Sequence, residues 1–431
     1  MATRKKLERF FKLSRMTASV AGRYLGEHIK ESLFSSEYRS QHAGDTHEWA
    51  GRRIAQTLGE LKGPLMKIGQ MASISSGLLP KEISDALAVL RKDVPFAPFD
   101  VIATQIQSEL GAPPEALFAS FDRQPFAAAS IGQVHRAVTD DGRPVVVKVQ
   151  YPDIGDSVDA DIAQLRLALR AAGLLRGSGP KFNRFFEEVS AQLREELDYC
   201  NEADNIRRLR SFHASRHPFV HIPIVVGERS SGRVLTMTFE DGDPLETAAE
   251  YPVEIRNRIG ERLVSIVYSQ ILEGGALHAD PNPANFAFRP DGDIALYDFG
   301  SVKQISAGEQ HGIRTLITGI FDGDADMVRM GFEQVGMLLP NEQAPDRIVF
   351  EAAIRLLSSA VKKEVPFDFA RSGIHREVLA AWPAIRKHAS TFHLTSAMMM
   401  IQRVNVGTYG NLRKLGASVP LRTVIENTMT P

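Results

Sequence analysis

The strongest constraint on this chain is a pair of polar loops that border short apolar runs. The first loop is HADPNPAN, residues 278–285, and the second is DFG, residues 298–300, which follows the apolar run IALY. Asn285 and Asp298 offer the hard oxygen ligands that Mg²⁺ prefers, and Asp280 can accept a proton from an attacking hydroxyl group or orient it. Together they indicate phosphoryl transfer, in which metal ions neutralise the charge that develops on the phosphates.

The spacing of these residues is that of the catalytic loop and the metal loop of protein kinases. Asn285 lies five residues after Asp280, and Asp298 lies 13 residues after Asn285. The tripeptide DFG alone is a weak signal, but its joint occurrence with D-x4-N and an apolar strand is a strong one. His278 is interpreted as a residue that orders the loop, because no His or Cys cluster with zinc spacing surrounds it.

A lysine stands in an apolar, β-branched run upstream, in PVVVKVQYP. Burying a charge without a partner is unfavourable, so Lys148 is expected to contact the α- and β-phosphates of a nucleotide and a carboxylate from a helix. The alternative is a lysine on an edge strand that faces water. The acidic stretch REELDYCNEADN, interpreted as one helix, offers the carboxylate: Glu202 and Asp198 share a face at a spacing of four, whereas Glu196 does not lie on the face of Asp198.

The composition is that of a soluble globular protein with more than one folded unit. The 431 residues are 43% hydrophobic and 24% charged, and the net charge of −1 gives no general reason to expect nucleic-acid binding. The single cysteine, Cys200, excludes an internal disulfide, fits a reducing compartment and is interpreted as inert and partly buried. No apolar run reaches the roughly 18 residues that a membrane span needs.

The first 30 residues carry an excess of Lys and Arg, with Leu and Phe interleaved. This pattern is compatible with an amphipathic helix that lies on anionic lipid and equally with a solvated terminus. A mitochondrial presequence is not expected, because the segment is not rich in serine. The expected location is the bacterial cytoplasm, with peripheral contact to the inner membrane and no transmembrane segment.

Helical and strand-like stretches alternate along the chain, which predicts an α+β fold. Residues 1–95 have helical spacing, and DVPFAPFD at 93–100 is interpreted as a linker because of its two prolines. Residues 96–240 carry strand signals on both sides of a turn at Asp141–Gly142, then helix, then the strand-like HIPIVVGE and GRVLTMTF. DGDPL interrupts the chain, and from Val253 onward the pattern is helical, except for a loop, a strand, a turn and a strand that end at DFG. A ligand cleft is expected between two such lobes.

Three features depart from ordinary protein kinases. No G-x-G-x-x-G precedes Lys148, and AAASIGQV at 127–134 stands in its place, so this loop is expected to cover phosphates differently. Ala279 occupies the position of the arginine that pairs with a phosphorylated activation segment. No A-P-E follows DFG, so the segment that docks peptides is not expected.

The chain resembles the UbiB family of atypical kinases, also called aarF-domain-containing kinases (ADCK). The resemblance rests on KIGQ at 67–70, AAAS at 127–130, VKVQYP, ELD at 196–198, EADN, HADPNPAN and DFG. It implies a two-lobed protein-kinase-like fold. The implied parts are a helical N-terminal extension with the KxGQ motif at 1–95, an N-lobe with a helical insert at 96–240 and a helical C-lobe at 241–431.

The resemblance implies a regulatory role for the KxGQ motif. In the family this helix folds over the kinase cleft, which would block a protein substrate from reaching Asp280. Lys67 is expected to pair with Glu196 and Asp198, and Gln70 is expected to face the phosphates. Breaking such a buried pair is unfavourable, because the remaining charge is left unpaired. The alternative is that the lysine and the glutamine are merely exposed helix residues.

The resemblance also assigns the nucleotide site. Glu202 is expected to pair with Lys148. The stretch LTMTFE is expected to meet the adenine, with Met237 guarding the back pocket and core packing as the alternative role of that side chain. The expected nucleotide-binding residues are Ala127, Ala128, Ala129, Ser130, Lys148, Met237, Thr238, Phe239 and Glu240.

The expected function is that of a protein that binds ATP and Mg²⁺, hydrolyses ATP slowly and supports ubiquinone (coenzyme Q) biosynthesis at the membrane. The expected partners are nucleotide, anionic membrane lipid, isoprenoid quinone precursors and ubiquinone-biosynthesis proteins, and no nucleic acid. Three alternatives stay open: a true protein kinase, a small-molecule kinase of the aminoglycoside or choline type, and a scaffold that binds nucleotide without turnover.

Overall fold

The computed structural model describes most of the chain after residue 95 and short helical pieces before it. The described residues are 11–12, 14–20, 22–23, 48–50, 52–54, 56–57, 96–129, 131–152, 154–155, 159, 162–163, 166–167, 170, 186–187, 190–191, 193–339, 345–362, 365–373, 391–393 and 395–429. Lys67, Gln70 and Ser130 lie outside these residues, so what the sequence predicts for them stays a prediction.

The chain divides into two compact units. The first comprises Met1–Asn201 and Val225–Thr238, and the second comprises Glu202–Ile224 and Phe239–Pro431. Residues 202–224 therefore group with the helix-rich part of the chain, although in sequence they precede the last strand of the strand-rich part. The helical extension that the sequence predicts for residues 1–95 stays a prediction.

The first unit contains an antiparallel sheet with the order β1-β3-β4-β6, in which β2 also pairs with β3. The predicted hairpin is confirmed: β3 and β4 pair along their whole length, and Gly142 of the turn has φ 80°, which glycine adopts without strain. GRVLTMTF is likewise confirmed as a strand. The strands are β1 Ser120–Phe121, β2 Ala127–Ala129, β3 Gly132–Val138, β4 Pro144–Gln150 and β6 Val234–Thr238.

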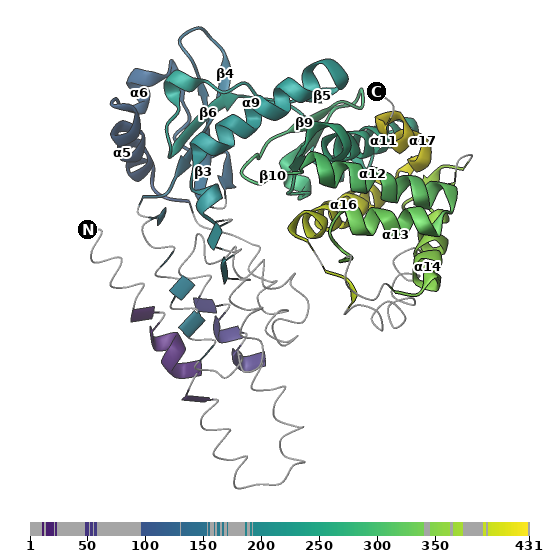
Figure 1. Ribbon diagram of the computed structural model, residues 1–431. Helices are drawn as coiled ribbons and strands as arrows, with labels where there is room; N and C mark the ends of the chain where they lie inside the picture. The colour runs from purple at the N-terminus through teal and green to yellow at the C-terminus, as the bar shows by residue number, and fades with distance from the viewer. Residues whose placement is uncertain are drawn as a thin grey trace. The chain divides into compact units, whose positions relative to one another are not determined.

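Two helices that the sequence does not predict, α5 Phe99–Leu110 and α6 Pro114–Leu117, lie beside this sheet (Figure 1). The linker interpretation of 93–100 is wrong at its end, because α5 begins at Phe99. Ile102 and Ile106 are one helical turn apart and fully buried. They join the apolar core of the sheet with Val145, Val147, Val149 and Val234.

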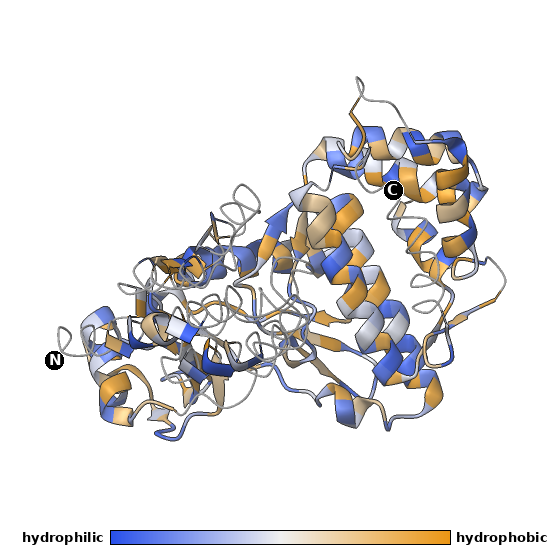
Figure 2. Ribbon diagram, turned by 90° about the horizontal axis from the view of Figure 1, so that it is seen from below, coloured by the Kyte–Doolittle hydropathy of each residue, from blue (hydrophilic) through white to orange (hydrophobic). Residues whose placement is uncertain are grey.

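Helices dominate the second unit, as predicted, and α11 begins at the expected residue, Val253. Apolar and polar residues lie on different sides of its helices (Figure 2). The helices are α10 Leu245–Ala248, α11 Val253–Ser269, α12 Ala307–Asp322, α13 Ala325–Gln334, α14 Arg347–Ser358, α16 Ser396–Leu415 and α17 Leu421–Met429. A π-helical turn, η3 Gln270–Gly274, continues α11.

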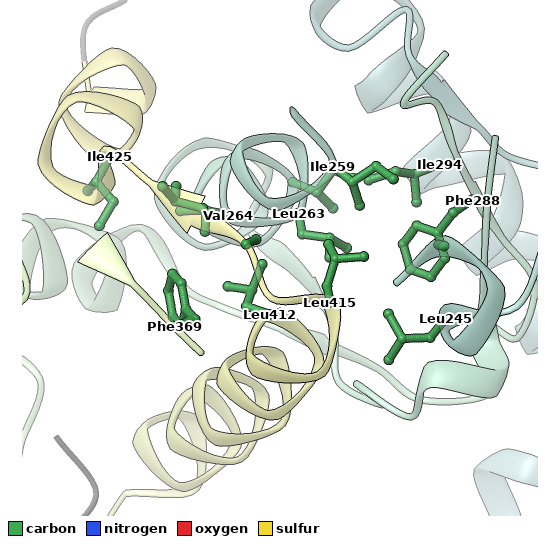
Figure 3. Close-up of a cluster of buried hydrophobic side chains, with 14 residues drawn as sticks. Leu245, Ile259, Leu263, Val264, Phe288, Ile294, Phe369, Leu412, Leu415 and Ile425 are labelled. Carbon is green, nitrogen blue, oxygen red and sulfur yellow. The ribbon is translucent and has the colours of Figure 1, made fainter. Parts of the chain in front are cut away.

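The core of the second unit joins α11 to α16. Leu263 of α11 and Leu412 and Leu415 of α16 are buried in one cluster, together with Phe288 from a short strand (Figure 3). Gly260 of α11 lets the segment that follows α16 approach, because a Cβ there would lie 2.8 Å from atoms of Ala417 and Val419. α16 is therefore part of the folded core of this unit.

Short strands line the polar loops of the second unit. The predicted order of loop, strand, turn and strand before DFG is confirmed, with Gly292 at φ 88° in the turn. The strands are β5 Val220–His221, β7 Ala276–His278, β8 Phe286–Phe288, β9 Ile294–Leu296, β10 Val302–Gln304, β11 Phe367–Asp368 and β12 Ser418–Val419. They pair as β5-β9-β8, β10-β7 and β11-β12.

The strand predicted for HIPIVVGE is wrong. Only His221 belongs to a strand, β5, and the following residues form a single bridge, Val225 with Met237, and a 3-10 turn, η2 Gly227–Arg229. Pro223 explains the interruption, because proline cannot donate a hydrogen bond to a sheet. Among the residues that the structure describes, no helix is long and apolar enough to cross a bilayer.

Candidate active site

In the first unit, Lys148 lies in the middle of the sheet. It is the fifth residue of β4 and pairs in register with Val134 on β3 and Leu235 on β6. Its side chain is only 7% exposed, and its ammonium nitrogen lies 5.1 Å from the centre of the Tyr199 ring. A lysine on an edge strand that faces water is therefore excluded. The attraction between the ammonium charge and the aromatic face offsets part of the cost of burying this side chain.

The alanine-rich segment is an edge strand rather than a loop. Ala127, Ala128 and Ala129 form β2 and pair with Val134, Gln133 and Gly132 of β3. The loop interpretation is wrong for these three residues, because their small side chains allow close antiparallel pairing. Their side chains stay partly or fully exposed, so they remain available to a ligand.

The acidic stretch REELDYCNEADN is not one helix. Glu196 ends one helical segment, and α9 Tyr199–Arg216 begins after Asp198. The Asp198 carboxylate accepts hydrogen bonds from the backbone N–H groups of Cys200 at 3.0 Å and Asn201 at 3.3 Å, so it caps α9. The prediction that Asp198 and Glu202 share a helical face is therefore wrong. The predicted pairing of Glu196 and Asp198 with Lys67 lies outside the described residues.

The prediction for the single cysteine also differs from the structure. Cys200 is exposed, because it occupies the first turn of α9 on the side that faces solvent. The predicted partial burial is therefore wrong. Exposure of a free thiol makes this residue accessible to modifying reagents.

Met237 and Thr238 end β6. Met237 is 5% exposed and pairs in register with Val146, so its side chain packs in the core of the first unit. Thr238 is the last residue of that unit, and Phe239 begins the second stretch of the other unit. The division of the chain thus falls within the stretch to which the sequence assigns adenine binding.

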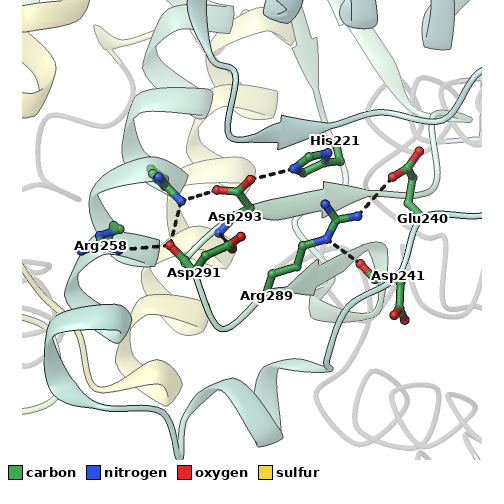
Figure 4. A network of polar contacts seen from close by, with 8 residues as sticks. His221, Glu240, Asp241, Arg258, Arg289, Asp291 and Asp293 are labelled. Atoms are coloured by element: carbon green, nitrogen blue, oxygen red, sulfur yellow. Dashed lines mark hydrogen bonds and ion pairs between the residues drawn. The ribbon is translucent and has the colours of Figure 1, made fainter.

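In the second unit, Glu240 belongs to a polar network (Figure 4). Arg289 Nη2 lies 3.3 Å from Glu240 Oε2, and the Tyr297 hydroxyl donates to the Glu240 carbonyl at 3.0 Å. Burial raises the pKa of Tyr297 to about 12, and the nearby charge of Asp241 adds to the shift. A second group in this network joins Asp293 to His221 and Arg262. These contacts fix the backbone that follows the predicted adenine-binding stretch.

The catalytic loop of the second unit is held from both ends. Its first end is β7, which pairs with β10, and the Ala279 N–H donates to the Ser301 carbonyl at 2.8 Å. At its second end, the Asn285 side chain donates to the Asp280 carboxylate at 3.0 Å and to the Asp280 carbonyl at 3.3 Å. Asp280 and Asn285, which the sequence places together, therefore do form one polar cluster.

The DFG segment is fixed by its backbone. The His278 ring donates to the Asp298 carbonyl, and the Gly300 N–H donates to the Asp298 carboxylate at 2.9 Å. His278 thus orders the loop, as expected. From α9, Glu202 accepts from the Phe299 N–H at 3.4 Å, and Asn205 donates to the Phe299 carbonyl at 3.0 Å.

Glu202 and Asn205 together hold Phe299, whose ring is fully buried. Glu202 itself is only 1% exposed, so a cationic partner at this site would act in a poorly solvated environment. The predicted pairing of Glu202 with Lys148 stays a prediction. Asn205 is a site residue that sequence reasoning missed, and its position three residues after Glu202 on the same helix is the signal that could have found it.

A buried chain of side chains supports the catalytic loop from behind, and the sequence does not predict it. The Gln270 amide oxygen accepts from the His278 N–H at 2.9 Å, which leaves its nitrogen to donate to His213 Nε2 at 3.0 Å. His213 Nδ1 then donates to His217 Nδ1 at 3.0 Å, and His217 Nε2 donates to Ser265 Oγ at 3.2 Å.

This chain fixes the protonation of its histidines. Burial lowers the pKa of His213 to about 3, and the neighbouring side chains of His217, His278 and Arg216 act in the same direction. Burial also lowers the pKa of His217, while Glu273 partly opposes the shift. Both imidazoles are therefore neutral at pH 7, as the order of donors and acceptors requires. Gln270 lies in the π-helical turn η3, a feature that is common near functional sites.

The donor set of the second unit fits a hard cation. The Asn285 nitrogen is used by Asp280, so the amide oxygen is the atom that can face a metal, and Asp298 adds a carboxylate. Within the described parts of the chain, no cluster of three or more His, Cys, Asp or Glu side chains could hold a metal. With one amide oxygen and one carboxylate from the loops, a cation at this site would draw further ligands from phosphate groups and water, as Mg²⁺ does.

Comparison with known proteins gives one consistent result. Residues 89–331 match the ABC1 atypical kinase-like domain. The chain is 32% identical to the Arabidopsis thaliana chloroplastic protein ACTIVITY OF BC1 COMPLEX KINASE 7 over 78% of this chain and 51% of that protein. It is 28% identical to the Caenorhabditis elegans mitochondrial atypical kinase coq-8 over 88% of this chain and 49% of that protein. The chain thus spans about half the length of these relatives.

A solved structure has the same fold. It is the complex of Rv3197 with erythromycin from Mycobacterium tuberculosis, which is 26% identical in sequence. The TM-score is 0.63, and the match covers 91% of this chain and 100% of that one. Together with the domain match, this likeness agrees with the predicted two-lobed protein-kinase-like fold.

Proposed function

The chain belongs to the ABC1 atypical kinase-like family, also called UbiB or ADCK, and on that premise we propose that it binds ATP with Mg²⁺ and hydrolyses it slowly. The observation that carries the proposal is the hydrogen bond between Asn285 and Asp280, in a loop that His278 ties to the DFG segment. These contacts hold the proposed proton acceptor, Asp280, close to the proposed metal ligand, Asn285, and tie their loop to the DFG segment.

Asp280 is the proposed proton acceptor. A water oxygen bonds to the γ-phosphorus, the bond from that phosphorus to the bridging oxygen breaks, and ADP leaves with the electron pair. Asp280 takes the proton of the water, and Asn285 keeps the carboxylate in place. Mg²⁺, held by Asn285 and Asp298, would neutralise charge on the phosphates.

The proposed phosphate and adenine contacts come from residues near Lys148, from β2 and from the stretch at 237–240. Lys148 contacts the α- and β-phosphates and pairs with Glu202, whose burial makes an unpaired carboxylate unfavourable. The exposed side of β2 covers the phosphates with Ser130. The adenine lies against Met237, Thr238, Phe239 and Glu240. Lys67, Gln70, Glu196 and Asp198 regulate access to the nucleotide.

The proposed physiological role is support of ubiquinone biosynthesis. Relatives named as COQ8 atypical kinases support this assignment. The protein would act as a peripheral protein on anionic membrane lipid, with isoprenoid quinone precursors and ubiquinone-biosynthesis proteins as partners. The basic N-terminal segment, with its interleaved Leu and Phe residues, suits such a membrane contact.

The test is ATP hydrolysis by the pure protein with Mg²⁺, with and without liposomes that contain anionic lipid. Asp298→Asn is the matched control, since it removes one charge and keeps the shape of the side chain. We expect turnover that rises with lipid and falls by about a hundredfold or more in the variant. Nucleotide binding without turnover under both conditions would favour the scaffold alternative. Phosphorylation of an added protein, lost in Asp280→Asn, would favour the protein-kinase alternative.

A further inference from the structure

One face of α16 meets the catalytic loop at three points. Arg403, Gly407 and Asn411 follow one another at a spacing of four, so they line one side of the helix. Arg403 Nη2 lies 3.7 Å from Asp280 Oδ1. A Cβ at Gly407 would lie 2.2 Å from Pro281 Cγ. Asn411 Nδ2 donates to the carbonyl of the same proline at 2.8 Å.

The helix that carries these residues is firmly placed in the second unit. Thr395 caps its first turn by accepting from the Met398 N–H at 3.3 Å. At its last turn, Arg256 donates to the Leu415 carbonyl at 3.0 Å, and Gly416 ends the helix with φ 67°. Its apolar residues Ile401, Val404, Leu412 and Leu415 are buried in the core. The face that meets the loop is therefore part of a rigid element.

The catalytic loop has no cation of its own. DPNPAN, residues 280–285, contains neither lysine nor arginine, and alanine stands immediately before it. The two carboxylate oxygens of Asp280 instead have different partners: Asn285 donates to Oδ2, and Arg403 faces Oδ1. Both members of the ion pair are about one quarter exposed, so water screens the pair and it contributes little to stability.

We propose that Arg403 is the positioning residue of the Asp280 carboxylate, and that the face formed by Arg403, Gly407 and Asn411 sets the catalytic loop. The proposal rests on the proposed role of Asp280 as proton acceptor. The guanidinium group orients the carboxylate for proton transfer. Gly407 lets the loop approach the helix, and Asn411 fixes the position of the loop along the helix axis.

The first experiment compares Arg403→Met with Arg413→Met, a control that removes an exposed arginine from the same helix. Without Arg403 we expect kcat for ATP hydrolysis to fall about tenfold or more, with KM for ATP within about twofold of wild type. Arg403→Lys is expected to recover part of the loss. Wild-type kcat in Arg403→Met would overturn the proposal.

A second readout does not need turnover. Asp280→Cys in a Cys200→Ser background places one thiol in the catalytic loop, and its rate of reaction with iodoacetamide at one fixed pH reports how accessible this position is. We expect faster reaction when Gly407→Ala is added, because the added methyl group forces the loop away from the helix, and no change when Arg413→Met is added. Faster reaction in a protein without Mg²⁺-dependent ATP hydrolysis would refute the proposed function and keep the role of this face in setting the loop. Equal rates in all three backgrounds would overturn that role.

Gly407→Ala and Asn411→Leu test the rest of the face. Gly407→Ala leaves the charge of Arg403 in place but forces the loop away from the helix, so kcat is expected to fall as well. If the three residues act on one loop, the effect of Gly407→Ala combined with Arg403→Met is smaller than the product of the single effects. Full additivity would show that the residues act independently and contradict a common face.

Discussion

At Gly132, a hydrogen atom is the only substituent that fits. The residue lies at the start of β3, and a Cβ there would approach the Val149 carbonyl oxygen to 2.1 Å. Backbone of the neighbouring strand cannot move aside without breaking the ladder that holds Lys148. The requirement for glycine in AAASIGQV is therefore one of close strand approach, and it acts on the sheet that carries the proposed phosphate contact.

Gly132→Ala is expected to destabilise the first unit by about 1–3 kcal/mol, because the added methyl group forces strands β3 and β4 apart. Gly232→Ala is the matched control, since a Cβ at that position meets nothing within 4 Å. Urea unfolding followed by circular dichroism would measure both. Equal midpoints for the two variants would contradict the close approach.

A second prediction at the scale of the residue concerns pH. The pKa of His213 is about 3 in the folded protein and near 6.5 when unfolded, so the unfolded state binds the proton more readily. The stabilising contribution is therefore complete above pH 6.5 and is lost as the pH falls towards 3. Between pH 6.5 and 5 the free energy of unfolding is expected to fall by about 2 kcal/mol for this one group.

His217 acts in the same direction, because burial also lowers its pKa. Thermal unfolding of the wild type and of His213→Leu from pH 7 to pH 5 measures the effect. The variant is less stable at pH 7, because it breaks the chain through Gln270, but its stability should depend less on pH. An equal pH dependence in both proteins would show that the His213 proton is not linked to folding.

At the scale of the element, the side chains of helix α9 hold several parts of the candidate site. Asp198 caps its first turn, Glu202 and Asn205 hold the backbone of Phe299, and His213 supports the catalytic loop through Gln270. The DFG segment and Gln270, which supports the catalytic loop, are thus both held by side chains of one helix. A shift of α9 along its axis would move both.

Asp198 has two proposed roles, as a helix cap and as a regulatory acid, and conservative substitution separates them. Asp198→Ala should cost about 1 kcal/mol of stability through loss of the cap, whereas Asp198→Ser keeps the cap and removes the charge. Asp204→Ala, at an exposed site on the same helix, is the control. Thermal unfolding and ATP turnover are both measured. A turnover change in Asp198→Ser without a stability change would support the regulatory role.

At the scale of the whole molecule, the proposed ligand should stabilise the fold. A nucleotide that binds only the native state raises the free energy of unfolding by about 2.7 kcal/mol at one hundred times Kd. We expect Mg²⁺–ATP to raise Tm in the wild type and to raise it much less in Lys148→Ala. Arg143→Ala, at an exposed position in the turn of the same hairpin, is the control and should keep the full shift. A full Tm shift in Lys148→Ala would show that this lysine does not contribute to nucleotide binding.

Local sequence determined a large part of this protein. Short apolar and β-branched runs bounded by turn residues predict β3, β4, β6, β8 and β9, because these signals are local. The spacing of Asp280, Asn285 and Asp298 predicts a phosphoryl-transfer site, and the hydrogen bond between Asp280 and Asn285 agrees with it. The sequence predicts a strand wrongly at HIPIVVGE, where the residues are apolar but Pro223 cannot donate a hydrogen bond to a sheet. It misses the strand at Ala127–Ala129, because pairing with β3 outweighs the low strand propensity of alanine.

Only the tertiary structure decided how distant residues meet. The contact between Asn411 and Pro281 joins residues 130 positions apart, and the one between Phe299 and Glu202 joins residues 97 positions apart. The hydrophobic pattern of one helix or strand cannot predict such pairs. Each residue fits the pattern of its own element whether or not its distant partner is present. The sequence therefore determined the residue types and spacings that can do the chemistry. Packing of α9 and α16 decided which side chains hold the catalytic loop, since burial and close approach depend on the whole fold.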